Sequence, residues 1–167
     1  RDNGLEELQD CTVMVTGASG MVGSYIIYTL IKLNEDYGRN INIVPLVRNV
    51  KKLNSTILSK SYVTPIVQDV TSPINCPWDV DYIIHAASPA SPKIMKEKPL
   101  ETNFANTIGT ANTIKYALEI GAKGYAYISS REIYGQPAEG QEFFTEYGPL
   151  GQVDPLVPRN GYAEGKK

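Results

Sequence analysis

The sequence is poor in the residues that bind transition metals and form disulfide bonds. It holds one histidine and two cysteines, Cys11 and Cys76, among its 167 residues. A histidine- or cysteine-rich metal centre and a disulfide framework are therefore excluded, and a reducing, cytoplasmic environment is expected. Long apolar runs are also missing, since the most apolar stretch, residues 21–33, is interrupted by Ser24 and Lys32. A membrane-spanning helix needs ~20 apolar residues, so no membrane association is expected.

A charge excess of either sign is absent as well. The chain carries 16 basic and 18 acidic residues, a formal net charge of -2. This balance gives no reason to expect nucleic acid or an anionic membrane surface as a partner. Glycine and proline occur 14 and 11 times, and 42% of the residues are hydrophobic, so the composition fits neither a fibrous nor a disordered chain. The sequence predicts a soluble globular domain.

Short β-branched runs alternate along the chain with longer stretches of helical spacing. The predicted strands are residues 12–16, 41–47, 63–67, 82–85 and 125–129. The predicted helices run from residue 21 to a C-cap at Gly38, from about 100 to 121, and onward from Tyr162. Because the strands are apolar without strict alternation, they should be covered on both faces. The pattern predicts an α/β fold, a doubly wound parallel sheet with helices on both faces.

A glycine-rich turn follows the first predicted strand. It reads Thr-Gly-Ala-Ser-Gly-Met-Val-Gly over residues 16–23, and a helix follows at once. In such a turn the first glycine permits a tight bend, the second lets a pyrophosphate approach, and the third lets the helix pack on the strand. The strand–turn–helix context predicts a dinucleotide site, where an isolated motif would fit an ordinary loop equally well. The residues expected to line it are Gly17, Ser19, Gly20, Met21, Val22 and Gly23.

The end of the second predicted strand indicates which dinucleotide binds. An acidic residue there would hold the adenosine ribose hydroxyls. The sequence instead has Arg48, with Lys51 and Lys52 close behind and no carboxylate nearby. A guanidinium is suited to a bidentate contact with a 2′-phosphate or to stacking on adenine, although a solvated basic turn has the same composition. The expected cofactor is NAD or NADP, with NADP favoured.

Two more strand ends are expected at the cofactor. Asp69, with Val70 beside it, follows the third predicted strand and could accept a hydrogen bond from the adenine amino group. Its alternative role is to cap the following turn. The fourth predicted strand ends in His85 and then small side chains, which let the backbone pass under a cofactor. We expect His85 to be a packed supporting residue rather than a base. The small residues are Ala86, Ala87 and Ser88.

Two final motifs carry the chemistry. The fifth predicted strand ends in Ser-Ser-Arg-Glu-Ile-Tyr-Gly, residues 129–135, and the last helix opens with Tyr162 and has Lys166 four residues on. Side chains four apart share one helical face, where an ammonium lowers the pKa of a phenol from ~10 toward neutrality. Ser130 can hydrogen-bond the same substrate oxygen. The three residues are typical of a proton-transfer site beside a hydride carrier.

Together these motifs resemble the extended short-chain dehydrogenase/reductase superfamily, in its NAD-dependent epimerase/dehydratase branch. The motif Asn-Thr-Ile-Gly-Thr at residues 106–110 adds to the likeness. The resemblance implies a Rossmann-like fold, a UDP- or dTDP-linked sugar as substrate, and Ser130, Tyr162 and Lys166 as a catalytic triad. It also implies that Asn106 lies near the active site. A homodimer is implied through the helices around residues 93–98 and 100–121.

Glu132 is the residue that separates the reactions of this branch. By resemblance, dehydratases carry Asp-Glu after the catalytic hydroxyl residue, whereas decarboxylases keep only the Glu. The sequence has Arg131 before Glu132, and a guanidinium cannot protonate a departing hydroxyl. A UDP-glucuronate-decarboxylase-like reaction is therefore favoured, with 4-epimerisation next. Glu132 is expected to project to the same side as Ser130 at the strand's end, unless it merely pairs with Arg131 or a loop lysine.

Two other functions stay open at this stage. An NADPH-dependent carbonyl reductase of the same superfamily fits Arg48 but leaves Glu132 unexplained. A non-catalytic dinucleotide-binding protein would have no need of the Ser-Tyr-Lys triad. The chain stops at Lys167, where the family continues with a substrate domain. We therefore expect residues 1–167 to be the NAD(P)-binding domain of a longer enzyme, inactive without the rest.

Overall fold

The computed structural model describes residues 5–89, 91–137, 139–147, 151, 153–154 and 156–167. The chain forms two compact units. The first, here called the sheet unit, takes the chain up to Ala87 together with Gly109–Tyr127. The second unit comprises Ser88–Ile108 and Ile128–Lys167.

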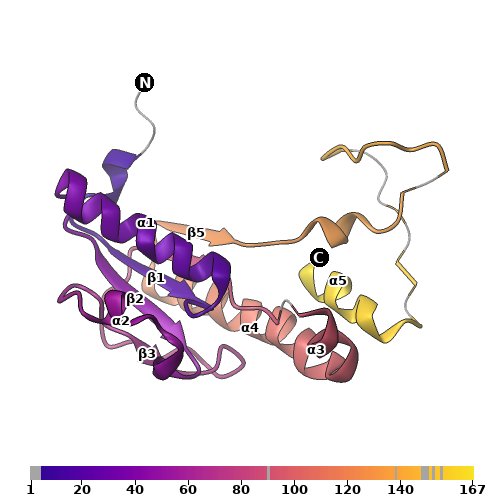
Figure 1. The fold of residues 1–167 in the computed structure, drawn as a ribbon, viewed down its shortest axis with the longest axis horizontal. Coiled ribbons are helices and arrows are strands. Elements are labelled where there is room, and N and C mark those ends of the chain that lie inside the picture. Colours follow the sequence, from indigo (N-terminus) through magenta and orange to yellow (C-terminus); the bar gives the residue numbers. More distant parts are fainter. Residues whose placement is uncertain (1–4, 90, 138, 148–150, 152, 155) are drawn as a thin grey trace. The chain divides into compact units, whose positions relative to one another are not determined.

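A five-stranded parallel sheet forms the sheet unit, in the order β3-β2-β1-β4-β5 (Figure 1). The strands are β1 Thr12–Thr16, β2 Asn42–Val47, β3 Ile66–Val67, β4 Tyr82–His85 and β5 Gly124–Tyr127. The chain leaves β1 for one edge of the sheet and later returns to the other side of β1. This reversal of strand order is the switch point at which open α/β sheets bind ligands. The predicted Rossmann-like sheet is confirmed.

Five α-helices and four short 3-10 helices accompany the strands in the described part of the chain. The α-helices are α1 Met21–Tyr37, α2 Ser55–Leu58, α3 Pro92–Glu97, α4 Pro99–Ile120 and α5 Gly161–Lys166. The 3-10 helices are η1 Leu5–Leu8, η2 Val50–Lys52, η3 Arg131–Tyr134 and η4 Pro158–Asn160. None of these helices has the length and apolar character that crossing a bilayer requires, over the residues that the structure describes.

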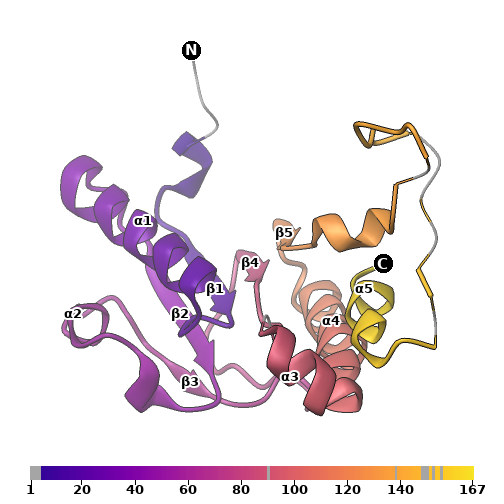
Figure 2. The same cartoon turned by 45° about the vertical axis from the view of Figure 1, so that its right-hand side comes forward.

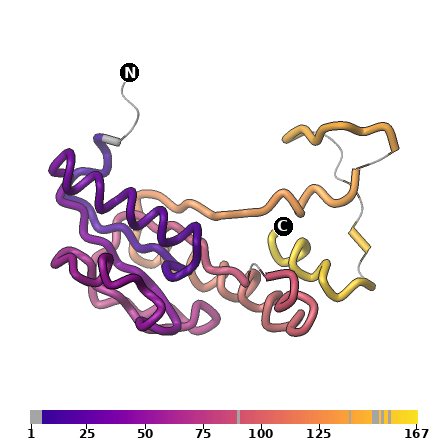
Figure 3. The backbone as a smooth tube through the Cα atoms, in the orientation of Figure 1, coloured from indigo at the N-terminus to yellow at the C-terminus, as the bar shows by residue number. Residues whose placement is uncertain are grey.

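Helices cover both faces of the sheet, as predicted. Because successive side chains of a strand point to opposite faces, β1 contributes to two separate cores. Val13 and Val15 pack in one cluster with Ile27 of α1, whereas Met14 packs in the other with Ala117 of α4. The tube in Figure 3 follows the chain through β1, α1 and back into β2.

Helix α1 ends where the sequence predicts. Gly38 adopts the left-handed conformation with a φ of 61°, and its N–H donates to the carbonyl oxygen of Asn34 at 3.0 Å. Glycine reaches this conformation without the steric cost of a Cβ atom, so it closes the last turn of the helix. The Asn34 side chain then binds both backbone groups of Ile41, which leads the chain into β2.

Three strands differ from their predicted bounds, although β2 does so only by beginning at Asn42 rather than at residue 41. Strand β3 is only Ile66–Val67, and Val63 forms an isolated bridge with Ile43. Pro65 lies between them and has no N–H to donate to the ladder. Strand β5 ends at Tyr127 rather than residue 129, because its neighbour β4 ends at His85, the residue paired with Tyr127. Residues 128–130 therefore have no strand beside them in the ladder.

His85 anchors the carboxyl ends of β1 and β4. Its ring is fully buried, with Nδ1 2.7 Å from Thr16 Oγ1 and Nε2 3.2 Å from Thr110 Oγ1. The backbone N–H of Ala87 donates to the same Thr16 hydroxyl at 3.1 Å. The ring also stacks on Tyr127, with centroids 5.7 Å apart. These contacts give His85 the supporting role that the sequence predicts.

Candidate active site

The glycine-rich turn lies between β1 and α1 and packs on the end of β4. Gly17 has a φ of 64°, and a Cβ atom there would lie 2.7 Å from the backbone of Ala86 and Ala87. A Cβ atom on Gly23 would collide with the carbonyl oxygen of Gly17 and come within 2.9 Å of Ala18 Cα. Side chains are excluded at both positions, and Gly20 adds the N-cap of α1. Three positions of the turn thus carry no side chain at the N-terminus of a helix.

The other predicted residues of this turn are exposed around the start of α1. Met21 and Val22 are 77% and 45% exposed, and Ser19 is exposed beside them. Ser19 also lines a recess of about 230 Å³ together with Lys52 and Asn54. Lys52 of η2 therefore lies close to the glycine-rich turn. The sequence alone shows Lys52 only as a neighbour of Arg48, because the path of residues 49–54 decides where its side chain lies.

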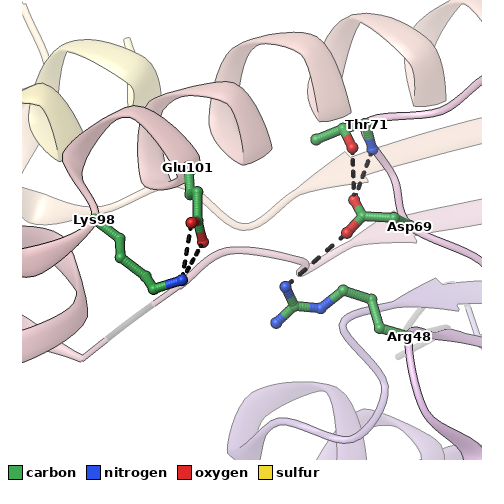
Figure 4. A network of polar contacts seen from close by, with 5 residues as sticks. All are labelled: Arg48, Asp69, Thr71, Lys98 and Glu101. Carbon is green, nitrogen blue, oxygen red and sulfur yellow. Dashed lines mark hydrogen bonds and ion pairs between the residues drawn. The ribbon is translucent and has the colours of Figure 1, made fainter.

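Asp69 and Arg48 face each other at the carboxyl ends of the strands (Figure 4). Asp69 Oδ1 accepts hydrogen bonds from the N–H and the hydroxyl of Thr71, both at 2.9 Å. The turn-capping role of Asp69 is thus present. Its Oδ2 lies 4.0 Å from Nη1 of Arg48, whose side chain is 75% exposed. An ion pair this long and this exposed contributes little to stability, so both groups keep surface for a ligand.

The remaining predicted cofactor residues differ in accessibility. Val70 is 6% exposed, and a Cβ atom on Gly109 would lie 2.7 Å from its Cγ2. Its carbonyl oxygen accepts a hydrogen bond from Asn112 Nδ2 at 2.9 Å. Val70 therefore packs the turn that follows β3 against α4. Ser88, which belongs to the second unit, has a buried Oγ with no hydrogen-bond partner among the described residues.

In the second unit, α5 is docked tightly on the first half of α4 (Figure 2). A Cβ atom on Gly165 would lie 3.0 Å from Asn106 Cβ, and Asn103 Nδ2 donates to the carbonyl oxygen of Gly161 at 3.2 Å. Asn106 itself is 1% exposed. Small residues on one face of α5 therefore fix the position of the helix that carries Tyr162.

Lys166 and Tyr162 are both buried in this helix. Lys166 is 4% exposed, and its Nζ donates to the carbonyl oxygen of Ile128 at 2.8 Å. Burial disfavours the charged ammonium and lowers the pKa of Lys166 from 10.5 to about 8. Tyr162 is 9% exposed and lies four residues earlier on the same helix. Lys166 therefore stays mostly charged at neutral pH and loses its proton at a lower pH than an exposed lysine would.

Ser130 and Glu132 lie in a 3-10 turn rather than at the end of a strand. Ser130 caps η3, and its Oγ accepts the N–H of Glu132 at 3.2 Å. The expectation that strand alternation would place the two on one side is wrong in its premise, because β5 ends at Tyr127. The capping bond still keeps the two residues together.

Glu132 is paired with neither Arg131 nor a loop lysine. Both of its carboxylate oxygens accept hydrogen bonds from Arg159, from Nη1 at 3.1 Å and from Nη2 at 2.7 Å. Such a bidentate pair holds the carboxylate in one plane as well as neutralising it. Arg159 is a residue that sequence reasoning missed, because 27 residues of chain separate the two partners.

A cavity of about 1130 Å³ opens in the second unit beside this pair. Glu132 and Arg159 line it, and α5 contributes Ala163 and Glu164 to its wall. Tyr162 and Lys166 of the same helix are buried and are not among the residues that line the cavity. The cavity is thus large enough for a sugar ring and adjoins the helix that carries the predicted proton-transfer residues.

Comparison with known proteins assigns the chain to a family. The sequence profile of the NAD dependent epimerase/dehydratase family matches residues 13–167. The chain belongs to the NAD dependent epimerase/dehydratase family. This confirms the resemblance that the glycine-rich turn and the Ser-Tyr-Lys pattern indicate.

Relatives and solved structures agree with this assignment. The chain is 33% identical to UDP-glucuronic acid decarboxylase 1 of Arabidopsis thaliana over 93% of its length, covering 34% of that protein. It is also 33% identical to UDP-glucuronic acid decarboxylase 1 of Xenopus tropicalis, over 98% of the chain and 37% of that protein. The structure of UDP-glucose 4-epimerase from Thermotoga maritima superposes with a TM-score of 0.70 at 21% identity, over 93% of this chain and 47% of that one. The chain thus spans between 33% and 43% of the length of curated relatives such as these.

The family's cofactor fits the sheet unit. Gly17 and Gly23 have no room for a Cβ atom because they pack against backbone, which makes the turn tight and leaves the exposed Gly20 at the N-cap of α1, where the helix dipole favours phosphate. Arg48 and Asp69, both with exposed side chains, lie at neighbouring strand ends. The adenosine of a bound dinucleotide is expected there. The residues present therefore suit a dinucleotide.

Two positioning residues of the second unit carried a signal in the sequence. Gly165 sits between Tyr162 and Lys166, where a glycine inside a helix costs stability unless a neighbour approaches closely. Asn103 lies three residues before Asn106 and so shares its side of α4. These patterns indicate that Gly165 and Asn103 lie at a helix contact. They do not indicate which helix is the partner.

Proposed function

We propose that the complete protein is an NAD(P)-dependent enzyme that decarboxylates a UDP-linked hexuronic acid. The observation that carries the proposal is the buried Lys166 on the helix of Tyr162, in the same unit as Ser130 and Glu132. The names of the relatives that are 33% identical support the substrate. A 4-epimerase is the second candidate, which the fold of the Thermotoga maritima enzyme supports.

In this proposal Tyr162 accepts the proton of a sugar hydroxyl. Lys166 carries its positive charge mainly below a pH of about 8, and it lies four residues from Tyr162 on the same helix. The hydroxyl of Ser130 hydrogen-bonds the same sugar oxygen. The dinucleotide, when bound, supplies the hydride acceptor.

Decarboxylation then follows from the position of the oxidised carbon. Oxidation of the hydroxyl β to the carboxylate gives a β-keto acid, which loses carbon dioxide because the ketone accepts the electron pair left behind. The carbon that lost carbon dioxide would take up a proton, and the hydride would return to the ketone while Tyr162 returns its proton, which would leave a UDP-pentose and no net change in the cofactor. A fixed Glu132 beside Ser130 would orient the sugar during these steps.

The products test this proposal. We expect the complete protein, incubated with UDP-glucuronic acid, to release carbon dioxide and form a UDP-pentose with no net change in cofactor, measured by gas capture and mass spectrometry. A uronic acid returned only as its C4 epimer, or a neutral UDP-hexose epimerised instead, would support the 4-epimerase. Steady consumption of NADPH with a carbonyl substrate would support a simple reductase.

We also propose that NADP is preferred over NAD. Arg48 stands where the family usually has an acid, and Lys52 lies by Ser19 in the recess at the glycine-rich turn. These two cations, one of them an exposed guanidinium, suit a 2′-phosphate, which carries negative charge that NAD lacks.

Replacing Arg48 by alanine separates the two cofactors. We expect the dissociation constant for NADP to rise about 10- to 100-fold, the usual range for losing one charge-assisted contact, with less than about twofold change for NAD. Titration of the complete protein with each dinucleotide measures both values. Lys51→Ala is the matched control, since Lys51 is an exposed neighbouring cation outside the recess. Equal losses for both dinucleotides would contradict the assignment.

A homodimer is proposed for the complete protein, with residues 1–167 as its dinucleotide-binding part in a cytoplasmic setting. Leu100, Phe104 and Ile108 recur every four residues on one side of α4 and are 69%, 47% and 41% exposed. Ile94 of α3 adds another exposed apolar side chain, at 41%. Such a stripe is costly in water and is suited to burial against a second copy. Sedimentation velocity should find twice the monomer mass.

A further inference from the structure

The cavity of the second unit is lined by three cations whose situations differ. Arg159 gives both terminal nitrogens to the carboxylate of Glu132, at 3.1 and 2.7 Å. Lys167 donates to Glu164 at 2.9 Å. Arg131 makes no ion pair with any residue that the structure describes, and its side chain is exposed at the cavity wall. Its guanidinium is the lining cation whose charge is left for a ligand.

The acids at the wall do not change this balance. Glu132 and Glu164 are the two that are already paired. Asp154 also lines the cavity, and its Oδ1 accepts the N–H of Leu156 at 2.9 Å within its own turn. No ion pair joins Asp154 to Arg131 within the described chain. An anion that enters the cavity would thus meet a Glu132 carboxylate that is already ion-paired with Arg159, and an Arg131 guanidinium without an ion-pair partner among the described residues.

We propose that Arg131 recognises the carboxylate of an acidic sugar and sets the preference for a hexuronic acid over a neutral hexose. This inference rests on the proposed function of the same site. Arg131 directly follows Ser130 along the chain, whose hydroxyl is proposed to contact the reacting sugar oxygen, and it lines the same cavity as Glu132. A planar guanidinium presents paired N–H donors that match the two oxygens of a carboxylate.

The pair of Glu132 with Arg159 makes this recognition physically possible. An unpaired carboxylate at Glu132 would repel a second carboxylate brought into the same cavity. The bidentate ion pair with Arg159 offsets the negative charge of Glu132 before the substrate binds. Arg159 therefore positions the carboxylate of Glu132, and Arg131 is the residue that binds the carboxylate of the substrate.

The test compares an acidic and a neutral ligand that differ only in the carboxylate. Dissociation constants for UDP-glucuronic acid and UDP-glucose are measured by calorimetry on the complete protein, in a Tyr162→Phe background that prevents turnover. Arg131→Gln should weaken UDP-glucuronic acid about 10- to 100-fold and change UDP-glucose less than about twofold. Arg131→Lys keeps the charge and should restore part of the loss. Lys93→Gln, which removes an exposed cation of α3, should change neither.

The outcomes separate this inference from the proposed function. Unchanged affinity for UDP-glucuronic acid in Arg131→Gln, or an equal loss for both ligands, would overturn the role of Arg131. Equal affinity of the protein with Arg131 intact for the two ligands would do the same. Carbon dioxide release, measured separately with Tyr162 present, reports on the decarboxylase proposal whatever the binding ratio shows.

Discussion

Replacing Tyr162 by phenylalanine is expected to lower the turnover number of the complete protein by about 10²- to 10⁴-fold, the contribution typical of a general acid–base group. The change removes only the phenolic oxygen and keeps the ring that α5 buries. Packing and dinucleotide affinity should therefore stay close to those of the unaltered protein. Carbon dioxide release, thermal unfolding and dinucleotide titration measure the three quantities.

A matched control uses the same chemical change elsewhere. Tyr147 is 98% exposed, so Tyr147→Phe should leave turnover unaltered. Near-normal turnover in Tyr162→Phe would disprove the role of Tyr162 as proton acceptor. A fall in turnover accompanied by loss of folding would instead show that the phenolic oxygen acts through stability, which the unfolding curve detects.

The second large effect is expected from Gly23→Ala in the glycine-rich turn. A Cβ atom there would meet the carbonyl oxygen of Gly17 and lie 2.9 Å from Ala18 Cα, and these are backbone atoms that cannot rotate away. The turn must therefore shift to admit the methyl group. Overpacking of this kind costs about 1–3 kcal/mol of folding free energy. Because the shifted turn is the proposed pyrophosphate site, dinucleotide binding should be lost as well.

Two other glycines calibrate this prediction. A Cβ atom on Gly20 would come only within 3.2 Å of the Gly17 oxygen, so Gly20→Ala should have a smaller effect on both quantities. Gly161 begins α5 with helical backbone angles and open space around its Cα, so Gly161→Ala should be tolerated. Thermal unfolding and dinucleotide titration order the three variants. An unfolding temperature and an affinity for Gly23→Ala that match those of Gly161→Ala would contradict the steric argument.

Local patterns determined the elements that depend on neighbours along the chain. The spacing of apolar residues predicted α1 and its end at Gly38, because helix periodicity and the left-handed C-cap are set within four or five residues. The strand–turn–helix context of the glycines predicted the tight turn before α1 for the same reason. The combination of motifs also indicated the family, whose profile matches residues 13–167.

Only the tertiary structure decided the features that join distant residues. Strand β5 ends at Tyr127 because its partner β4 ends at His85, which no property of β5 alone reveals. Glu132 is held by Arg159 rather than by Arg131, and Lys166 reaches the carbonyl oxygen of Ile128, because the path of the loop and the docking of α5 on α4 bring them together. Burial then lowers the pKa of Lys166 to about 8, since desolvation depends on everything packed around a group and not on its sequence neighbours.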